Sequence, residues 1–196
     1  MPESQHQQRQ QRLKDKVEAR IESAQLERGI LIVFTGNGKG KTTAAFGTVT
    51  RAIGHGLKAA VVQFIKGGWD NGERALLEPL GVPFHVMATG FTWDTQNRDY
   101  DTQACLQTWQ QAVPLLSDPS IDLVVLDELT YMVSYGYLPL EEVLLRLTQR
   151  PEHQTVIITG RGCHRELLEL ADTVTEMRPV KHAFDAGIKA QKGIDW

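Results

Sequence analysis

A glycine-rich run with lysine and two threonines lies near residue 40 and has the composition of a phosphate-binding loop. It follows the apolar run 30–34 and leads into Ala44, Ala45 and Phe46, which are typical of a helix. Glycines allow successive backbone N–H groups to point into one concavity, and a helix N-terminus adds positive potential. Lys41 would supply a point charge to a phosphate, and the Thr42 hydroxyl a ligand to Mg²⁺.

The spacing of this loop departs from the common G-x-x-x-x-G-K-[ST] pattern, which would put a glycine at position 35. Thr35 stands there instead, and three residues separate Gly36 from Gly40. We therefore expect the loop to hold a triphosphate differently from a phosphoryl-transfer enzyme. The residues predicted to bind the nucleotide here are Gly36, Asn37, Gly38, Lys39, Gly40, Lys41, Thr42 and Thr43.

A second apolar run, 121–126, ends in two carboxylates, Asp127 and Glu128. Acids at the end of a buried strand are typical of a Mg²⁺ site beside a phosphate-binding loop, so Thr42, Asp127 and Glu128 are the candidate metal ligands. Which of the two acids ligates the metal directly is left open. A helix cap is the alternative for Asp127, because Leu-Thr-Tyr-Met follows. Arg161, after the run 157–160, would reach a phosphate from there or lie on a surface turn.

These residues need strands whose carboxyl ends meet at one edge, and the rest of the chain provides them. Strands are predicted at 30–34, 59–64, 82–87, 121–126, 155–159 and 173–176. Helices are predicted near 42–53, 73–80, 99–117, 139–149 and 164–171. This alternation predicts an α/β fold with a mostly parallel six-stranded sheet flanked by helices and an N-terminal helical arm. Together with the phosphate-binding loop, it makes the expected fold P-loop NTPase-like (RecA-like).

The arm is residues 1–28, and residues 29–196 form one domain that carries the phosphate-binding loop. Leu13, Val17, Ile21 and Ala24 recur at helical spacing in the arm and make a narrow apolar stripe. Such a helix needs a surface to dock on, and a solvated arm is the alternative.

Composition excludes several classes of protein. A chain of 196 residues with 41% hydrophobic and 23% charged residues is typical of a globular protein rather than a disordered or fibrous one. The net charge of -3 provides no general field for nucleic acid, and no apolar run approaches the roughly 20 residues of a membrane span. Cys105 and Cys163 form no metal or redox motif, and the polar N-terminus is unlike a secretory signal, so a cytoplasmic location is expected.

Three aromatic residues follow predicted strands at the same edge of the sheet, namely Trp69, Phe91 and Trp93. Each could plug the end of the sheet. Together, flanked by glycines, they indicate a second ligand that is large and flat. The six histidines have no H-E-x-x-H pattern, so no zinc site is predicted.

The chain resembles the P-loop ATP:cob(I)alamin (corrinoid) adenosyltransferases of the CobA type over essentially its whole length. The segments that carry the resemblance include FTGNGKGKTTAAFGT, VVQFIKG, NGER, MATGFTW, VVLDELTYMV, YLPLEEV, TVIITGRGCH and VKHAFDAGIKAQKGIDW. The resemblance implies transfer of the 5′-deoxyadenosyl group of ATP to cobalt(I), with release of triphosphate, in cobalamin biosynthesis and salvage. It also implies a cytoplasmic homodimer that uses Mg²⁺, or Mn²⁺ in its place, and receives electrons from reduced flavodoxin.

For this reaction Lys41, Thr42 and Glu128 are the predicted catalytic residues, since they would offset charge on the triphosphate. The resemblance assigns corrinoid binding to Phe91 and Trp93, and the grouping of aromatic residues adds Trp69. Two other classes share the motifs. A P-loop ATPase or kinase would attack phosphorus, with Glu128 orienting water or an acceptor hydroxyl. A non-catalytic module would bind ATP or corrinoid without turnover. The sequence leaves open the preferred corrinoid and the role of residues 181–196.

Overall fold

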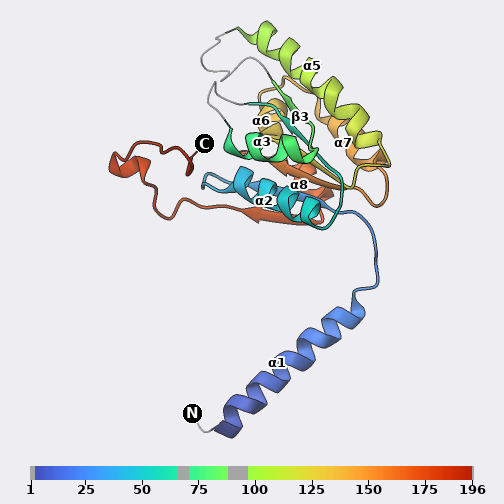
Figure 1. The fold of residues 1–196 in the computed structure, drawn as a ribbon, viewed down its shortest axis with the longest axis vertical. Coiled ribbons are helices and arrows are strands. Elements are labelled where there is room, and N and C mark those ends of the chain that lie inside the picture. The colour runs from blue at the N-terminus through green and yellow to red at the C-terminus, as the bar shows by residue number, and fades with distance from the viewer. Residues whose placement is uncertain (1–2, 66–70, 88–96, 196) are drawn as a thin grey trace.

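Six parallel strands form one sheet in the order β3-β2-β4-β5-β1-β6 (Figure 1). This computed structural model describes residues 3–65, 71–87 and 97–195, with side chains from residue 5, so the predicted roles of Trp69, Phe91 and Trp93 lie outside the described residues. The strands are β1 (Leu31–Thr35), β2 (Ala59–Gln63), β3 (Phe84–Val86), β4 (Leu123–Asp127), β5 (Thr155–Thr159) and β6 (Thr173–Glu176). The predicted α/β fold is confirmed, and the sheet is parallel throughout.

Helices connect the strands in the predicted alternation. They are α1 (Glu3–Ser23), α2 (Lys41–Gly54), α3 (Gly72–Leu77), α5 (Arg98–Ser117), α6 (Leu129–Ser134), α7 (Leu140–Gln149) and α8 (Arg165–Leu170), with short 3₁₀ turns η1 (Glu78–Leu80) and η2 (Phe184–Ala186). The predicted helix 73–80 is divided between α3 and η1, and α6 was not predicted. Among the described residues, no helix has the length and apolar character that a membrane span requires.

The two faces of the sheet pack against different helices because neighbouring strand residues point to opposite faces. One core contains Val62, Leu126 and Ile158 with residues of α5, α6, α7 and α8. The other contains Val61, Val125 and residues of α2 and α3. The central strands β2 and β4 are buried along their whole length, as expected for parallel strands covered on both faces. Because the strands are parallel, the carboxyl ends of β1, β4 and β5 lie together on the same side of the sheet.

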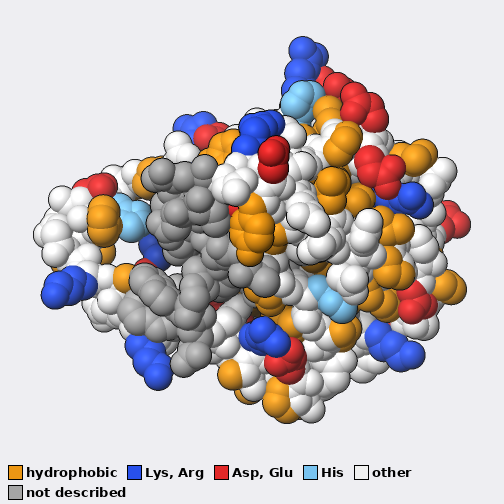
Figure 2. Space-filling model, turned by 90° about the horizontal axis from the view of Figure 1, so that it is seen from above, with side chains coloured by type: hydrophobic (Ala, Val, Ile, Leu, Met, Phe, Trp, Pro, Cys, Tyr) orange, Lys and Arg blue, Asp and Glu red, His pale blue; other side chains and the backbone are white. Residues whose placement is uncertain are grey.

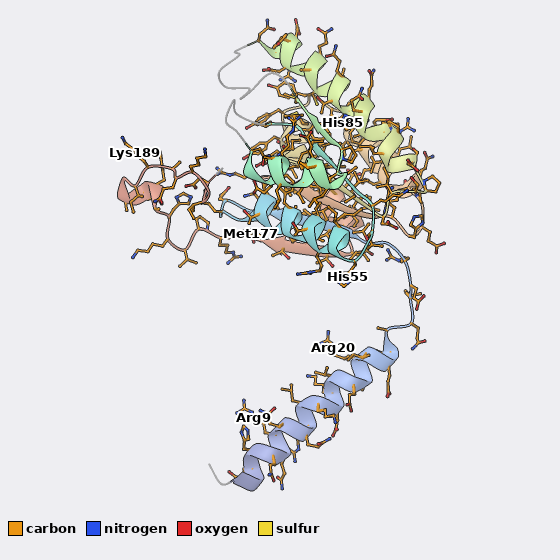
Figure 3. The ribbon with its side chains drawn as sticks, in the orientation of Figure 1. Arg9, Arg20, His55, His85, Met177 and Lys189 are labelled. Carbon is orange, nitrogen blue, oxygen red and sulfur yellow. The ribbon has the colours of Figure 1, made fainter. Side chains whose placement is uncertain are left out.

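Helix α1 extends away from the sheet and its helices, as Figure 1 shows. Its stripe residues Leu13, Val17 and Ile21 are 57%, 46% and 67% exposed. Arg9 and Arg20 project from the same helix without another element beside them (Figure 3). The helical character of the arm is thus confirmed, and its docking stays a prediction.

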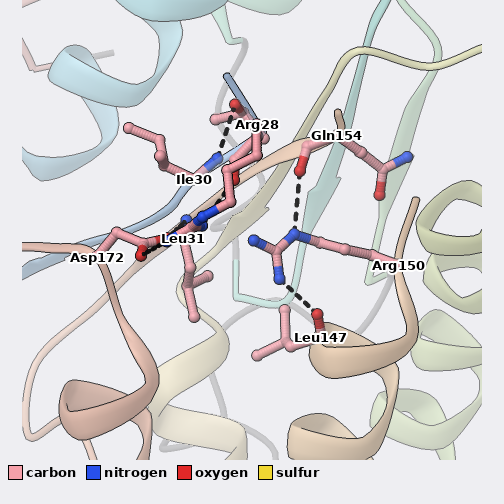
Figure 4. A network of polar contacts seen from close by, with 9 residues as sticks. Arg28, Ile30, Leu31, Leu147, Arg150, Gln154 and Asp172 are labelled. Carbon is pink, nitrogen blue, oxygen red and sulfur yellow. Dashed lines mark hydrogen bonds and ion pairs between the residues drawn. The ribbon is translucent and has the colours of Figure 1, made fainter. Parts of the chain in front are cut away.

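A polar network secures the segment between the arm and β1 (Figure 4). Asp172 accepts hydrogen bonds from both terminal nitrogens of Arg28, at 2.5 and 3.0 Å, and from the backbone N–H of Leu31 at 2.9 Å. Arg150 donates to the carbonyl oxygens of Leu147 at the end of α7 and Gln154 before β5. The Arg28 contacts lower the pKa of Asp172 to about 2. The first strand is therefore held in place partly by an ionised carboxylate.

This network predicts a pH-dependent contribution to stability. The pKa of Asp172 is lower in the folded chain than its value of about 3.9 in an unfolded one. Its contribution is therefore present above pH ~4 and is lost as the pH falls toward ~2. We expect Asp172→Asn to lower the melting temperature at pH 7 by a few degrees, and the difference from the unmodified protein to shrink at acid pH.

Thermal unfolding at several pH values between 3 and 7 measures this difference. Glu169→Gln is the control, because it removes an exposed pair with Arg165 on α8 that should contribute little. A difference for Asp172→Asn that stays constant over the whole pH range would contradict the prediction.

Candidate nucleotide site

The phosphate-binding loop begins one residue later than the common pattern because β1 continues through Thr35. Thr35 pairs with Glu176 of β6, so the chain turns only at Gly36, where φ is 92°. A Cβ atom at Gly36 would lie 2.4 Å from the carbonyl oxygen of Met177. Both the backbone conformation and this close approach require glycine. The shifted glycine thus follows from the length of the strand.

The loop rests against the chain that leaves β6. The backbone N–H of Gly38 donates to the carbonyl oxygen of Met177 at 2.7 Å. A Cβ atom at Gly38 would lie 2.8 Å from the carbonyl carbon of Met177. Met177 lies beside the start of α2 in Figure 3. The loop is therefore supported by the exit of an edge strand.

Lys41 folds back over the loop. Its Nζ donates to the carbonyl oxygens of Gly36 and Gly38, each at 2.8 Å, and the residue is only 7% exposed. Burial lowers the pKa of Lys41, and the nearby carboxylate of Glu128 opposes that shift. The ammonium group is thus placed in the concavity of the loop, where a phosphate would be bound.

Asp127 is a buried carboxylate that accepts hydrogen bonds from side chains on three elements. Its Oδ1 accepts from Thr42 of α2 at 2.9 Å and from Thr159 of β5 at 2.7 Å. Its Oδ2 accepts from Gln63 of β2 at 2.9 Å. The alternative of a helix cap does not hold, since the residue at the N-cap of α6 is Glu128. Asp127 therefore orients the Thr42 hydroxyl.

Glu128 is the one non-glycine residue with positive φ (60°) in the described part of the chain. Its backbone N–H donates to Thr159 Oγ1 at 2.9 Å, which secures this unfavourable conformation. Gly160 makes room beside it, because a Cβ atom there would lie 2.1 Å from Thr130 Oγ1 and 3.2 Å from Glu128 Oε2. The turn directs the Glu128 side chain to the pocket, whereas Asp127 stays in the interior.

A pocket of about 600 Å³ opens over the loop and the ends of β4 and β5. The predicted residues that line it are Gly38, Lys39, Gly40, Lys41, Thr42, Thr43, Glu128 and Arg161. Gly36, Asn37 and Asp127 are not among the lining residues. The volume lies within the range of small-molecule sites.

Half of the lining residues in the described part of the chain were not predicted from the sequence. These residues are Ile65, Gly72, Glu73, Leu76, Tyr131, Gly193, Ile194 and Asp195. Burial and the Glu128 carboxylate raise the pKa of Tyr131. The start of α3 and residues 193–195 thus form walls of the pocket, although their segments were not assigned to a binding site from the sequence.

The C-terminal segment returns to the loop. Asp195 pairs with Lys39, which lowers the pKa of Asp195, and its other oxygen accepts the backbone N–H of Gln191 at 2.8 Å. Residues before this return project from the body as a lobe, at left in Figure 2, with basic side chains on its rim. The segment therefore closes one side of the pocket.

The oxygen donors at the site fit Mg²⁺. Thr42 offers a hydroxyl whose hydrogen is donated to Asp127, so its lone pairs are available to a cation, and Glu128 offers a carboxylate at the pocket wall. Within the described residues no group of three His, Cys, Asp or Glu could hold a metal by itself. Mg²⁺ is commonly held by one or two protein oxygens together with substrate phosphates, which agrees with this donor set.

The two cysteines are unsuited to nucleophilic chemistry. Burial raises the pKa of Cys105 to about 12 and that of Cys163 to about 11, so both remain thiols near neutral pH.

Comparison with known proteins agrees with the geometry of the site. The family described as ATP:corrinoid adenosyltransferase BtuR/CobO/CobP matches residues 27–196. Corrinoid adenosyltransferase of Escherichia coli K12 is 72% identical over 196 residues, which is all of both chains. Corrinoid adenosyltransferase CobA of Salmonella typhimurium LT2 is 70% identical over the same full length.

A more distant relative gives the same result. Corrinoid adenosyltransferase of Pseudomonas aeruginosa is 51% identical over 193 residues, or 97% of this chain and 95% of the relative. The matched residues therefore include the phosphate-binding loop, the two acids at the end of β4 and the C-terminal segment. This chain belongs to the ATP:corrinoid adenosyltransferase family.

Proposed function

We propose that this protein transfers the 5′-deoxyadenosyl group of ATP to the cobalt(I) of a corrinoid and releases triphosphate, in cobalamin biosynthesis and salvage. It is a corrinoid adenosyltransferase by family. The observation that carries the proposal is the pocket in which Lys41, Thr42 and Glu128 converge at the carboxyl edge of a parallel sheet. Ligands of open α/β sheets bind at this edge.

Cobalt(I) in the corrinoid substrate is itself the nucleophile, so the site needs no general base. The cobalt–carbon bond forms at C5′ of the ribose as the bond from C5′ to the triphosphate oxygen breaks, and the electron pair of that bond leaves with triphosphate. Lys41 and the N-terminal amides of α2 would offset the developing negative charge. The γ-phosphorus is not the atom attacked, which agrees with a loop whose spacing differs from the phosphoryl-transfer pattern.

Thr42 and Glu128 would hold Mg²⁺ directly, and Asp127 would act through the Thr42 hydroxyl. When bound, the ion would stabilise charge on the leaving triphosphate. Arg161 at the pocket wall would bind a phosphate oxygen. The other loop residues, Gly36, Asn37, Gly38, Lys39, Gly40 and Thr43, would complete the ATP-binding cradle.

Phe91, Trp93 and Trp69 are proposed to bind the corrinoid. Aromatic rings packed where an axial donor would sit supply no lone pair strong enough to ligate cobalt. They would thereby favour a four-coordinate metal that reduced flavodoxin can reduce to cobalt(I).

The arm, residues 1–28, is proposed to serve a cytoplasmic homodimer by docking over the pocket mouth of a subunit. The exposed stripe of Leu13, Val17 and Ile21 supports docking on some surface, because an apolar helix face gains stability when it is buried. The family resemblance supports the pocket mouth as that surface. Residues 29–196 would bind both substrates, and the docked arm would exclude water from them.

Product analysis tests the proposed reaction. Incubated with ATP, Mg²⁺ and chemically reduced cobalamin, the protein should form adenosylated corrinoid and triphosphate in equal amounts. The visible spectrum follows the corrinoid, and chromatography quantifies the phosphates. ADP and phosphate formed without corrinoid would instead indicate an ATPase.

Removal of the charged groups should impair catalysis severely. We expect Lys41→Ala and Glu128→Ala each to lower kcat by at least ~10²-fold, through loss of charge stabilisation or of metal support. Lys58→Ala and Glu141→Ala serve as controls, because they remove one positive and one negative charge at exposed positions outside the pocket. Near-normal kcat in both pocket variants would show that these residues have no catalytic role.

Deletion of residues 1–25 should impair use of the corrinoid without unfolding the rest of the protein. We expect KM for the corrinoid to rise several-fold, whereas the melting temperature of the remaining domain changes little because the arm lies outside both cores. Steady-state kinetics and thermal unfolding measure the two effects. Unchanged kinetics would support a solvated arm without a role in binding.

A further inference from the structure

Three side chains, those of Asp127, Gln63 and Asn71, form a hydrogen-bonded series that runs from the interior to the wall of the pocket. Gln63 Nε2 donates to Asp127 Oδ2 at 2.9 Å, and Asn71 Nδ2 donates to Gln63 Oε1 at 3.1 Å. Asn71 Oδ1 accepts the backbone N–H of Arg74 at 3.2 Å, which caps α3. Gln63 and Asp127 are 0% and 1% exposed, so water cannot readily replace a lost partner.

The direction of this series is determined at both ends. An ionised carboxylate only accepts hydrogen bonds, so Gln63 must present its NH₂ group to Asp127 and its oxygen to Asn71. A backbone N–H only donates, so Asn71 must present its oxygen to Arg74 and its NH₂ group to Gln63. Two amide side chains linked by a hydrogen bond satisfy both the Asp127 carboxylate and the Arg74 N–H. A carboxylate at either position would lack the required donor.

Asp127 and Asn71, the two ends of this hydrogen-bonded series, contact different parts of the site. Asp127 Oδ1 accepts from Thr42, whose hydroxyl is the proposed Mg²⁺ ligand. At the other end, Asn71 immediately precedes Gly72, which together with Glu73 and Leu76 of α3 lines the pocket. The orientation of the Thr42 hydroxyl and the position of the α3 wall are thus joined by consecutive hydrogen bonds.

We propose that Gln63 and Asn71 are positioning residues for the binding of Mg²⁺–ATP. They fix the rotation of the Asp127 carboxylate, and with it the Thr42 hydroxyl, relative to the wall formed by the start of α3. The inference rests on the proposed binding of Mg²⁺ by Thr42. Partners of this kind, which orient a metal ligand without touching the metal, typically change metal affinity about 10–100-fold when they are removed.

The decisive variant is Asn71→Ser, because it separates the two roles of Asn71. Serine caps a helix about as well as asparagine, so α3 keeps its cap. Its short side chain lacks the amide that donates to Gln63. Asn97→Ser is the matched control, since Asn97 caps α5 through Tyr100 N–H at 3.1 Å in the same way. Gln63→Leu removes the middle of the series with a similar volume.

Calorimetric titration with ATP, in excess Mg²⁺ and separately in EDTA, measures the effect on binding. For Asn71→Ser and Gln63→Leu we expect Kd in Mg²⁺ to rise about 10-fold, whereas Kd in EDTA changes less than about 2-fold. The double variant should bind within about 2-fold of Gln63→Leu, because the two residues act through one series. Asn97→Ser should bind as the unmodified protein does.

Two results would overturn the proposal. If Asn71→Ser binds Mg²⁺–ATP normally and only Asn71→Ala is impaired, Asn71 merely caps α3. If Kd rises equally with and without Mg²⁺, the residues contribute packing alone. Asn71 is only half-buried, so Asn71→Ser keeps the test decisive even where Gln63→Leu fails to fold. Failure of the proposed reaction would appear separately, as absence of adenosylated corrinoid from the unmodified protein.

Discussion

The buried carboxylate of Asp127 is the constraint on which the site depends. An ionised group in the interior is costly unless its oxygens are hydrogen-bonded, and here three side chains supply those bonds. They belong to α2, β2 and β5, which are separate in sequence. Any displacement of one of these elements would leave a buried charge with fewer partners. The relative placement of the phosphate-binding loop and the neighbouring strand ends is therefore coupled to the stability of the interior.

The different positions of Asp127 and Glu128 show how two consecutive acids take different tasks. A continued strand would send the second acid to the opposite face of the sheet. The left-handed turn at Glu128, held through Thr159, instead brings that residue to the pocket wall. A non-glycine residue in this conformation costs about 1–3 kcal/mol, which the surrounding hydrogen bonds must offset. The strained residue is also the one that reaches the pocket.

Strands β2, β4 and β5 could be predicted because buried parallel strands are largely apolar and alternate with helical stretches, whereas the edge strand β6 was also predicted although it is exposed at all four positions. Helix α6 was missed because it has six residues and begins directly after the turn at Glu128. The pocket walls from α3 and the chain end lie in segments that carry the family resemblance, but no phosphate-binding or metal-binding pattern marks their residues as part of a pocket. The Lys39–Asp195 pair joins residues far apart in sequence. One usable signal was overlooked: Gln63 is polar at the end of an otherwise apolar strand, which indicates a buried partner.

The phosphate-binding loop is also held by residues that follow β6. Gly38 donates to Met177 just after β6, and Lys39 pairs with Asp195 where the chain returns from its C-terminal lobe. The loop is therefore contacted by both ends of one segment, residues 177–195, which follows the edge strand β6 and forms a wall of the pocket. Lys39 lines the pocket and is paired with Asp195 of this segment, so the positive charge that a bound phosphate would meet there is already partly balanced by a carboxylate.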